Sequence, residues 1–213
     1  MYYLLIAYFI FNYQLAFSSI YEQERNLIEI YGDLDKDKKE EKVVVTELNE
    51  VGENGKKREL SIYKKQNSDW VLLVASKSAV LESEAGGMMG DPFISKQIEI
   101  KNGVLIIYHD GGSSWKWNTT HKYRFQNNQF ELIGYHSYSG KLCEYWEDFE
   151  YNLSTGKIIY SKVFESCENE EQVASKIIKE TCNKKLKTLP TLKNINTIER
   201  KIITPKNKVE LNY

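Results

Sequence analysis

Four acidic side chains are closely spaced near the amino-terminal end of the chain. Asp33, Asp35 and Asp37 fall within five residues, and Glu41 follows shortly after them. Counted from Asp33, these carboxylates take positions 1, 3, 5 and 9 of a loop, and the backbone carbonyl of Lys39 stands at position 7. Oxygen ligands at this spacing suit Ca²⁺. We therefore predict a Ca²⁺ site formed by Asp33, Asp35, Asp37 and Glu41.

The segment Gly32–Val45 resembles the Asp-rich loop and following strand of FG-GAP/VCBS-type repeats, which read roughly G-D-x-[DN]-G-D-G-x-x-D-x-x-V. The resemblance covers one copy of about 14 residues and implies Ca²⁺ binding, but it does not carry over the propeller fold that many copies build. Lys36 and Lys38 replace glycines that let such a loop curl, and Glu41 replaces an aspartate. The alternative interpretation is a structural loop whose lysines partly neutralise the acids.

Three further stretches are similar to a broad class of exported bacterial proteins that carry one such loop. They are Gly86–Phe93 (GGMMGDPF), Gly111–Trp115 (GGSSW) and Phe130–Gly134 (FELIG). This resemblance implies export and no particular activity. Gly86–Phe93 lacks the strand-then-helix setting of a phosphate loop, so we interpret it as a structural or partner-contacting loop.

Other side chains offer weaker chemistry. Glu144, Asp148 and Glu150 share one face of a predicted strand with Trp146, and paired carboxylates beside a tryptophan can act on a glycoside. Carboxylates on one strand do not flank a bond from opposite sides, so a solvated face is the other interpretation. Adjacent strand residues point to opposite faces, which argues against a catalytic pair formed by His109 and Asp110. No residue is assigned a catalytic role.

The elements that must position these residues are β-strands joined by tight turns. We predict strands at residues 42–48, 59–63, 70–75, 94–101, 104–108, 115–126, 129–135, 144–151 and 157–163, with turns at Asn102-Gly103 and Asn127-Asn128. The strand at 115–126 alternates over its whole length, with Trp115, Trp117, Tyr123 and Phe125 on an aromatic face that we expect to be buried. If instead its tryptophans and Trp146 are exposed to solvent, a carbohydrate-binding module becomes an alternative function.

The amino terminus and the cysteines bear on the compartment. Residues 1–19 carry no charged side chain, and Ala16-Phe17-Ser18 fits cleavage of a signal peptide after Ser18. An uncleaved anchor and an internal strand remain alternatives. The odd count of three cysteines leaves at least one thiol unpaired. Cys167 and Cys182 can pair in an oxidising compartment, and three reduced thiols are the other interpretation.

The charge balance weakens a role with nucleic acid, because the formal net charge is −1 and only 4 of the 29 basic residues are Arg. Residues 169–185 fit a helix or a strand, and the excess of positive charge in residues 184–213 fits a solvated tail or a patch for an anionic surface. The sequence thus predicts a mainly β protein: an antiparallel meander of about 8–10 strands over residues 19–213, with one short helix possible near its carboxyl end.

We expect this domain to be an exported, non-enzymatic binding module. Its partner would be a protein or a glycan of the cell envelope, with no nucleic acid and no membrane span after processing. A carboxylate-dependent hydrolase is the alternative from another class.

Overall fold

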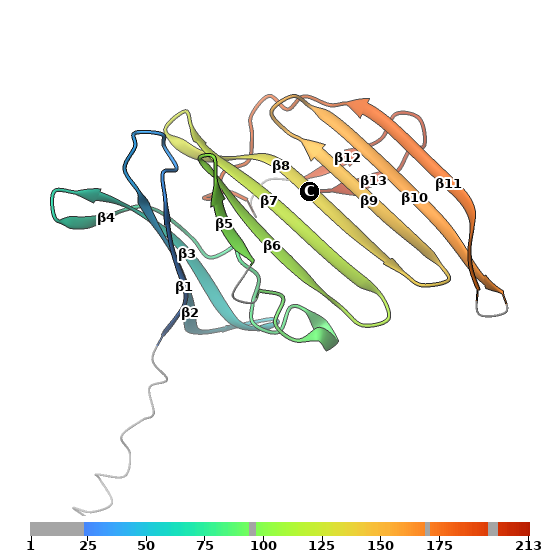
Figure 1. Cartoon of the computed structure of the whole chain (residues 1–213), viewed down its shortest axis with the longest axis horizontal. Helices are drawn as coiled ribbons and strands as arrows, with labels where there is room; N and C mark the ends of the chain where they lie inside the picture. The colour runs from blue at the N-terminus through green and yellow to red at the C-terminus, as the bar shows by residue number, and fades with distance from the viewer. Residues whose placement is uncertain (1–23, 94–96, 169–170, 196–199) are drawn as a thin grey trace, which may run out of the picture.

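Thirteen β-strands and one short 3-10 helix make up the regular structure of the residues that can be described. The computed structural model describes residues 24–93, 97–168, 171–195 and 200–213 (Figure 1). The predicted signal peptide, residues 1–18, lies outside them. In chain order the elements are β1 (Arg25–Gly32), β2 (Glu41–Gly52), β3 (Gly55–Gln66), β4 (Asp69–Ser76), the helix η1 (Gly87–Met89), β5 (Ile98–Lys101), β6 (Val104–Gly112), β7 (Lys116–Gln126), β8 (Gln129–Lys141), β9 (Tyr145–Asn152), β10 (Lys157–Glu168), β11 (Glu171–Asn183), β12 (Lys201–Ile203) and β13 (Glu210–Asn212).

The strands form two antiparallel meanders and a hairpin. One sheet has the order β1-β2-β3-β4, the second has the order β11-β10-β9-β8-β7-β6-β5, and β12 pairs with β13. Figure 1 shows the seven-stranded sheet as the broad surface of the molecule, with the smaller sheet beside it. The two sheets meet where Ile100 of β5 closely approaches Gly32 of β1. The predicted mainly β meander is confirmed.

The tight turns follow from residues that accept a left-handed backbone. Asn102 and Gly103 have φ values of 54° and 73° and join β5 to β6. Asn127 and Asn128 have φ values of 51° and 59° and join β7 to β8. Asparagine and glycine tolerate these angles, and a turn of this kind matches the twist of the strands that it connects. Both predicted turns are confirmed.

The main core lies on the inner face of the seven-stranded sheet and against the smaller sheet. On β6, Leu105 and Ile107 are fully buried, and the register places Tyr123 and His121 of β7 opposite them. The other buried members of this cluster come from both large sheets and from the C-terminal hairpin, and they include Val43, Val45, Leu60, Ile62, Leu132, Phe149, Tyr151, Ile158, Tyr160, Ile202, Leu211 and Tyr213.

The aromatic face of β7 is buried only in part. Tyr123 is 1% exposed, whereas Trp115, Trp117 and Phe125 keep intermediate exposure. Trp115 packs edge-on against Tyr145 at 5.0 Å between ring centroids. The prediction of a wholly buried aromatic face was therefore too strong, because part of this face borders an open cavity.

Residues 171–183 form the long edge strand β11, so a helix in this segment is wrong. The segment pairs with β10 from Lys157↔Asn183 to Glu168↔Glu171, with one bulge. The helix-like charge pattern is outweighed by backbone hydrogen bonding along the whole length of a neighbouring strand. The strands β1, β12 and β13 were not predicted either, and they raise the number of strands above the expected range.

Both interpretations of the cysteines are wrong: Cys167 does not pair with Cys182, and the three thiols are not all reduced. Cys143 and Cys167 form a disulfide, and Cys182 is free. In the β10–β11 hairpin Cys182 lies opposite Ile158, nine residues before Cys167, which separates the two cysteines by about 30 Å along the strand. The β8–β9 turn instead brings Cys143 to the far end of β10, where the Cα atoms of Cys143 and Cys167 are 5.1 Å apart.

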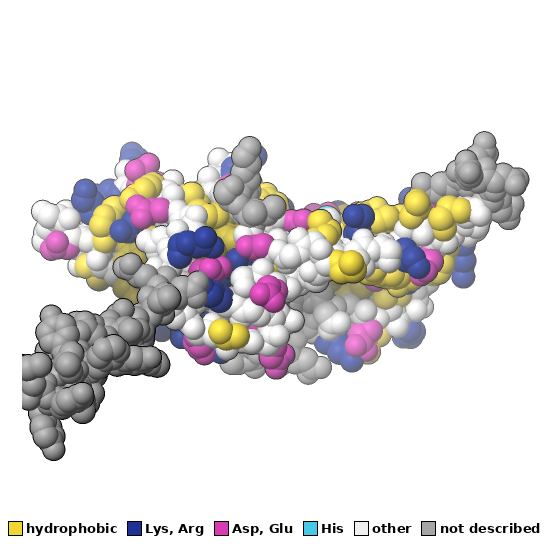
Figure 2. Space-filling model, turned by 90° about the horizontal axis from the view of Figure 1, so that it is seen from below, with side chains coloured by type: hydrophobic (Ala, Val, Ile, Leu, Met, Phe, Trp, Pro, Cys, Tyr) yellow, Lys and Arg dark blue, Asp and Glu magenta, His cyan; other side chains and the backbone are white. Residues whose placement is uncertain are grey.

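The surface mixes charges of both signs. On the face shown in Figure 2, basic and acidic side chains are interspersed and no large area carries one sign. In the part of the chain that is described, no helix has the length and apolar character that crossing a membrane requires.

Candidate functional site: the Asp33–Glu41 loop

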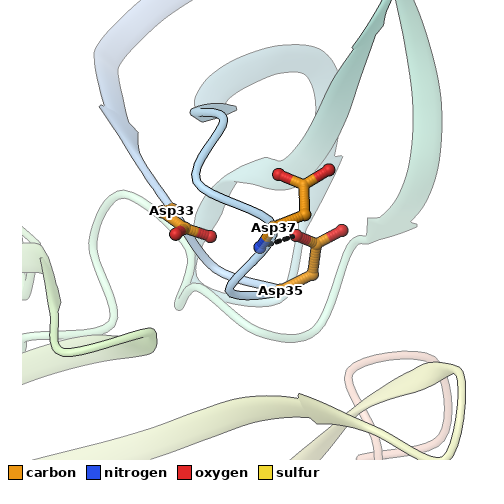
Figure 3. A group of neighbouring side chains, drawn as sticks. All are labelled: Asp33, Asp35 and Asp37. Carbon is orange, nitrogen blue, oxygen red and sulfur yellow. Dashed lines mark hydrogen bonds between the residues drawn. The ribbon is translucent and has the colours of Figure 1, made fainter.

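The four predicted ligands lie on the connection between β1 and β2. β1 ends at Gly32, and β2 begins at Glu41, so the three aspartates occupy the loop and Glu41 occupies the first strand position. The antiparallel register places Glu41 opposite Lys64 of β3. Figure 3 shows the three aspartate side chains arranged around this single loop.

The aspartates hold the loop in shape by accepting hydrogen bonds from its backbone. Asp33 accepts from the N–H groups of Lys36 at 2.6 Å and Lys38 at 3.0 Å. Asp35 accepts from the N–H of Asp37 at 3.1 Å (Figure 3). Asp37 in turn accepts from the N–H of Lys39 at 2.8 Å. Asp33 thus uses both of its carboxylate oxygens within the loop. Asp35 and Asp37 each use one oxygen there, which leaves their second oxygen for contacts outside the loop.

The loop curls at the two positions where the resembled loop has glycine. Lys36 and Lys38 have φ values of 67° and 68°. A residue with a Cβ atom pays a conformational cost in this region, and lysine is not one of the residues that favour it. The hydrogen bonds that Asp33 accepts from the same two residues offset that cost.

Glu41 is the buried member of the group. Its side chain is 0% exposed, and its Oε2 atom accepts from the N–H groups of Leu34 at 2.8 Å and Asp35 at 3.3 Å. Its Oε1 atom is buried and has no hydrogen-bond partner among the described residues. Burial raises the pKa of Glu41, while the two backbone N–H groups act in the opposite direction. A buried carboxylate oxygen without a partner is unusual and needs a counterpart.

Lys64 supplies a cation that the sequence did not predict for this site. Its ammonium group forms ion pairs with Asp35 and, at 2.8 Å, with Asp37. The hydrogen bond from Lys64 lowers the pKa of Asp37, with a smaller contribution from the N–H of Lys39. Lys64 is distant in sequence, and only the β2–β3 register brings it next to the loop. Within one loop the sequence carries no signal for this partner.

The arrangement can hold a cation with oxygen atoms alone. Asp33, Asp35 and Asp37 each offer one carboxylate oxygen, and these oxygens lie within 4.8 Å of one another. That is a donor set suited to Ca²⁺, which takes carboxylate and carbonyl oxygens. Glu41 is held at the base of the loop through its contacts with Leu34 and Asp35.

The second carboxylate group suggested by the sequence does not form a catalytic pair. Asp148 shares a hydrogen bond with Nε2 of His136 at 2.9 Å, and Glu144, which precedes β9, forms an ion pair with Lys141 at 2.5 Å. Trp146 keeps intermediate exposure and stacks on Tyr138 at 5.1 Å between ring centroids. These side chains are engaged with neighbours of their own sheet, and they do not surround a common space.

The Gly86–Phe93 loop has a structural anchor. Arg58 is 0% exposed and donates to both carboxylate oxygens of Asp91, at 2.7 Å and 2.5 Å. Glu47 accepts from the same guanidinium at 3.2 Å. Asp91 thus fastens this loop to β3, in agreement with the structural interpretation of the segment.

Comparison of the chain with protein-family models, with curated proteins and with solved structures found no match. The functional argument therefore depends on the geometry of the chain itself.

Proposed function

We propose that the chain is an exported, non-enzymatic binding module whose Asp33–Glu41 loop binds Ca²⁺ weakly. The observation that supports this function is the group of three aspartate oxygens within 4.8 Å of one another; the predicted fourth ligand, Glu41, is not a member of this group. Bound Ca²⁺ would relieve the repulsion between these carboxylates. Lys64 already supplies one positive charge, so an ion must compete with this ammonium group for Asp35 and Asp37.

The disulfide supports the exported location. Cys143 and Cys167 are paired, and disulfides persist mainly in oxidising compartments outside the cytosol. The uncharged apolar start of the sequence agrees with a signal peptide.

The test is the melting temperature of the protein with Ca²⁺ against chelator. With a dissociation constant of about 1 mM, about 10 mM Ca²⁺ should add about 1.4 kcal/mol to the free energy of unfolding. For a chain of this size that corresponds to a rise of about 3–5 °C. Asp35→Ala should abolish the rise, and Asp35→Asn should weaken it, because an amide oxygen still coordinates.

Two further variants separate ion binding from general stability. Lys64→Gln removes the competing ammonium group and should enlarge the Ca²⁺-dependent rise. Asp148→Ala removes one carboxylate from the other large sheet and should leave that rise as in the wild type. If neither the wild type nor Lys64→Gln responds to Ca²⁺, the loop is purely structural and the proposed ion site is withdrawn.

A further inference from the structure

A second site-like feature lies far from the Asp33–Glu41 loop in sequence. A cavity of about 410 Å³ is bounded by β6, β7 and β8, by the segment that follows β4 and by the C-terminal segment. Its lining includes six rings, from His109, Trp117, His121, Tyr123, Tyr135 and Tyr213. In Figure 1 the C-terminal hairpin lies behind the seven-stranded sheet, where it helps to enclose this space. The volume falls within the range of small-molecule sites.

Two buried ring nitrogens in this lining have no partner among the described residues. His109 is 2% exposed, and its Nε2 atom accepts from the N–H of Leu81 at 3.2 Å. The neutral ring must then carry its proton on Nδ1, and this donor has no acceptor within the described part of the chain. The Nδ1 atom of His121 is also without a partner there. Tyr123, which is 1% exposed, contributes its hydroxyl group to the same lining.

Unpartnered buried polar groups are rare in folded proteins, and each one needs an explanation. Two of them around one cavity indicate a missing polar occupant. Because the Nδ1 of His109 can only donate and a tyrosine hydroxyl can also donate, the occupant must offer acceptors.

The charge in the inner part of the cavity is positive. Arg200 lines it, and no carboxylate of the described residues forms an ion pair with Arg200. The pKa of His121 is lowered to about 3, mainly by burial, with further contributions from the neighbouring His109 and from the charge of Arg200. Burial raises the pKa of Tyr123, and here too Arg200 is the charge that acts on the group.

The other charged side chains of the lining do not cancel this field. Lys77 is paired with Glu50 at 2.9 Å. Glu82 accepts from the N–H of Asn54 at 2.5 Å. Glu53 also lines the cavity, but neither it nor Glu82 is among the charges that act on His121 or Tyr123. Arg200 is thus the charge that acts on Tyr123, Tyr135 and His121, whereas His109 is influenced by Arg58 and Asp91 behind the cavity wall.

We propose that this cavity binds a small organic carboxylate, with Arg200 and Tyr123 contacting the carboxylate and Trp117 contacting a ring of the ligand. A guanidinium matches a carboxylate in shape and charge. The half-buried Trp117 offers a flat apolar surface at the same cavity. The volume has room for a ligand built on one sugar or aromatic ring.

The test measures binding of two acids and their neutral counterparts to the full chain. The probes are D-glucuronate with D-glucose, and benzoate with benzamide, titrated by calorimetry and by ligand-observed NMR. At least one acid should bind with a dissociation constant below about 10 mM, and its neutral counterpart should bind about tenfold more weakly or worse. Which acid binds distinguishes an acidic sugar from an aromatic acid.

Variants of lining residues test whether the acid binds in this cavity. Arg200→Gln should weaken binding of the acid about tenfold or more, as expected for loss of a charge-assisted contact. Tyr123→Phe keeps the ring and should weaken binding by a smaller factor, which provides a readout even if Arg200→Gln folds poorly. The matched control is Arg124→Gln, because Arg124 lies on β7 but not in the cavity lining, and this variant should bind as the wild type does.

Three results would overturn the proposal. They are no binding of either acid, equal affinity for an acid and its neutral counterpart, and unchanged affinity in a folded Arg200→Gln or Tyr123→Phe variant. The Ca²⁺ response of the Asp33–Glu41 loop is measured separately, so failure at one site does not decide the other.

Discussion

The buried guanidinium of Arg58 on β3 ties the Gly86–Phe93 loop to the smaller sheet. Asp91 accepts two hydrogen bonds from Arg58, and its Oδ1 atom also accepts from the N–H of Phe93 at 2.8 Å. Asp91→Ala removes these acceptors and leaves the charge of Arg58 with Glu47 as its remaining carboxylate. A buried charge that loses its partner strongly destabilises the folded state.

The expected cost follows from these contacts. Two hydrogen bonds to a charged group contribute about 1.5–3 kcal/mol each. The Asp91 side chain is 37% exposed and Glu47 remains, so solvent and the second carboxylate bring the loss to the low end, about 3 kcal/mol. With a urea dependence of about 2 kcal/mol/M, the unfolding midpoint should fall by about 1.5 M. Equilibrium unfolding in urea, followed by tryptophan fluorescence, measures this change.

Two controls separate charge from shape. Asp91→Asn keeps an acceptor for Phe93 and the side-chain volume, so it should cost clearly less than Asp91→Ala. Adding Arg58→Met to Asp91→Ala removes the unpaired charge and should recover part of the lost stability. A loss below about 1 kcal/mol for Asp91→Ala would show that Glu47 alone balances Arg58, and the reasoning from paired burial would be refuted.

Three other predictions concern separate parts of the structure. Cys143→Ser opens the bridge to Cys167 and should lower the free energy of unfolding by about 3 kcal/mol under oxidising conditions, with no effect in reductant. Gly111→Ala should cost about 1–3 kcal/mol in urea unfolding, because its Cβ would lie 2.6 Å from Cζ2 of Trp117, and a neutral result would contradict this packing. Burial lowers the pKa of His109 from 6.5 to about 4. Between about pH 6.5 and pH 4 this histidine is therefore protonated in the unfolded chain and neutral in the folded chain. Stability should therefore fall by up to about 3 kcal/mol as the pH drops to about 4, and His109→Gln should flatten unfolding free energies measured across this range.

Local sequence signals predicted the strands β2 to β10 and the two asparagine turns, but not β1, β12 or β13. Asn102-Gly103 and Asn127-Asn128 carry their conformational preference in the residues themselves, and the alternation of residues 115–126 is a property of one strand. The segment 169–185 could not be resolved in this way, because its strand depends on pairing with β10. The disulfide could not be predicted for the same reason, because the pairing of neighbouring strands brings Cys143 to Cys167.

The candidate sites likewise combine features that are visible in the sequence with features that only the fold creates. The spacing of Asp33, Asp35 and Asp37 is visible in the sequence, and the structure brings their oxygens together. The ion pairs from Lys64 arise from a neighbouring strand and are invisible locally. The cavity was also missed, because Arg200 and His109 meet only when the C-terminal segment folds back over the sheet.

The meander has a consequence for the order of folding. Strands of both large sheets pair only with strands next to them in sequence, so successive hairpins form them with short loop closures. The C-terminal segment instead makes distant contacts, in which Leu192 donates to the carbonyl of Phe130 at 3.0 Å and Leu132 donates to that of Pro190 at 2.8 Å. Its docking closes a much longer loop than any of the hairpins does. If the cavity holds the proposed ligand, that ligand would slow release of this segment and lengthen the lifetime of the folded state, without changing the rate of sheet assembly.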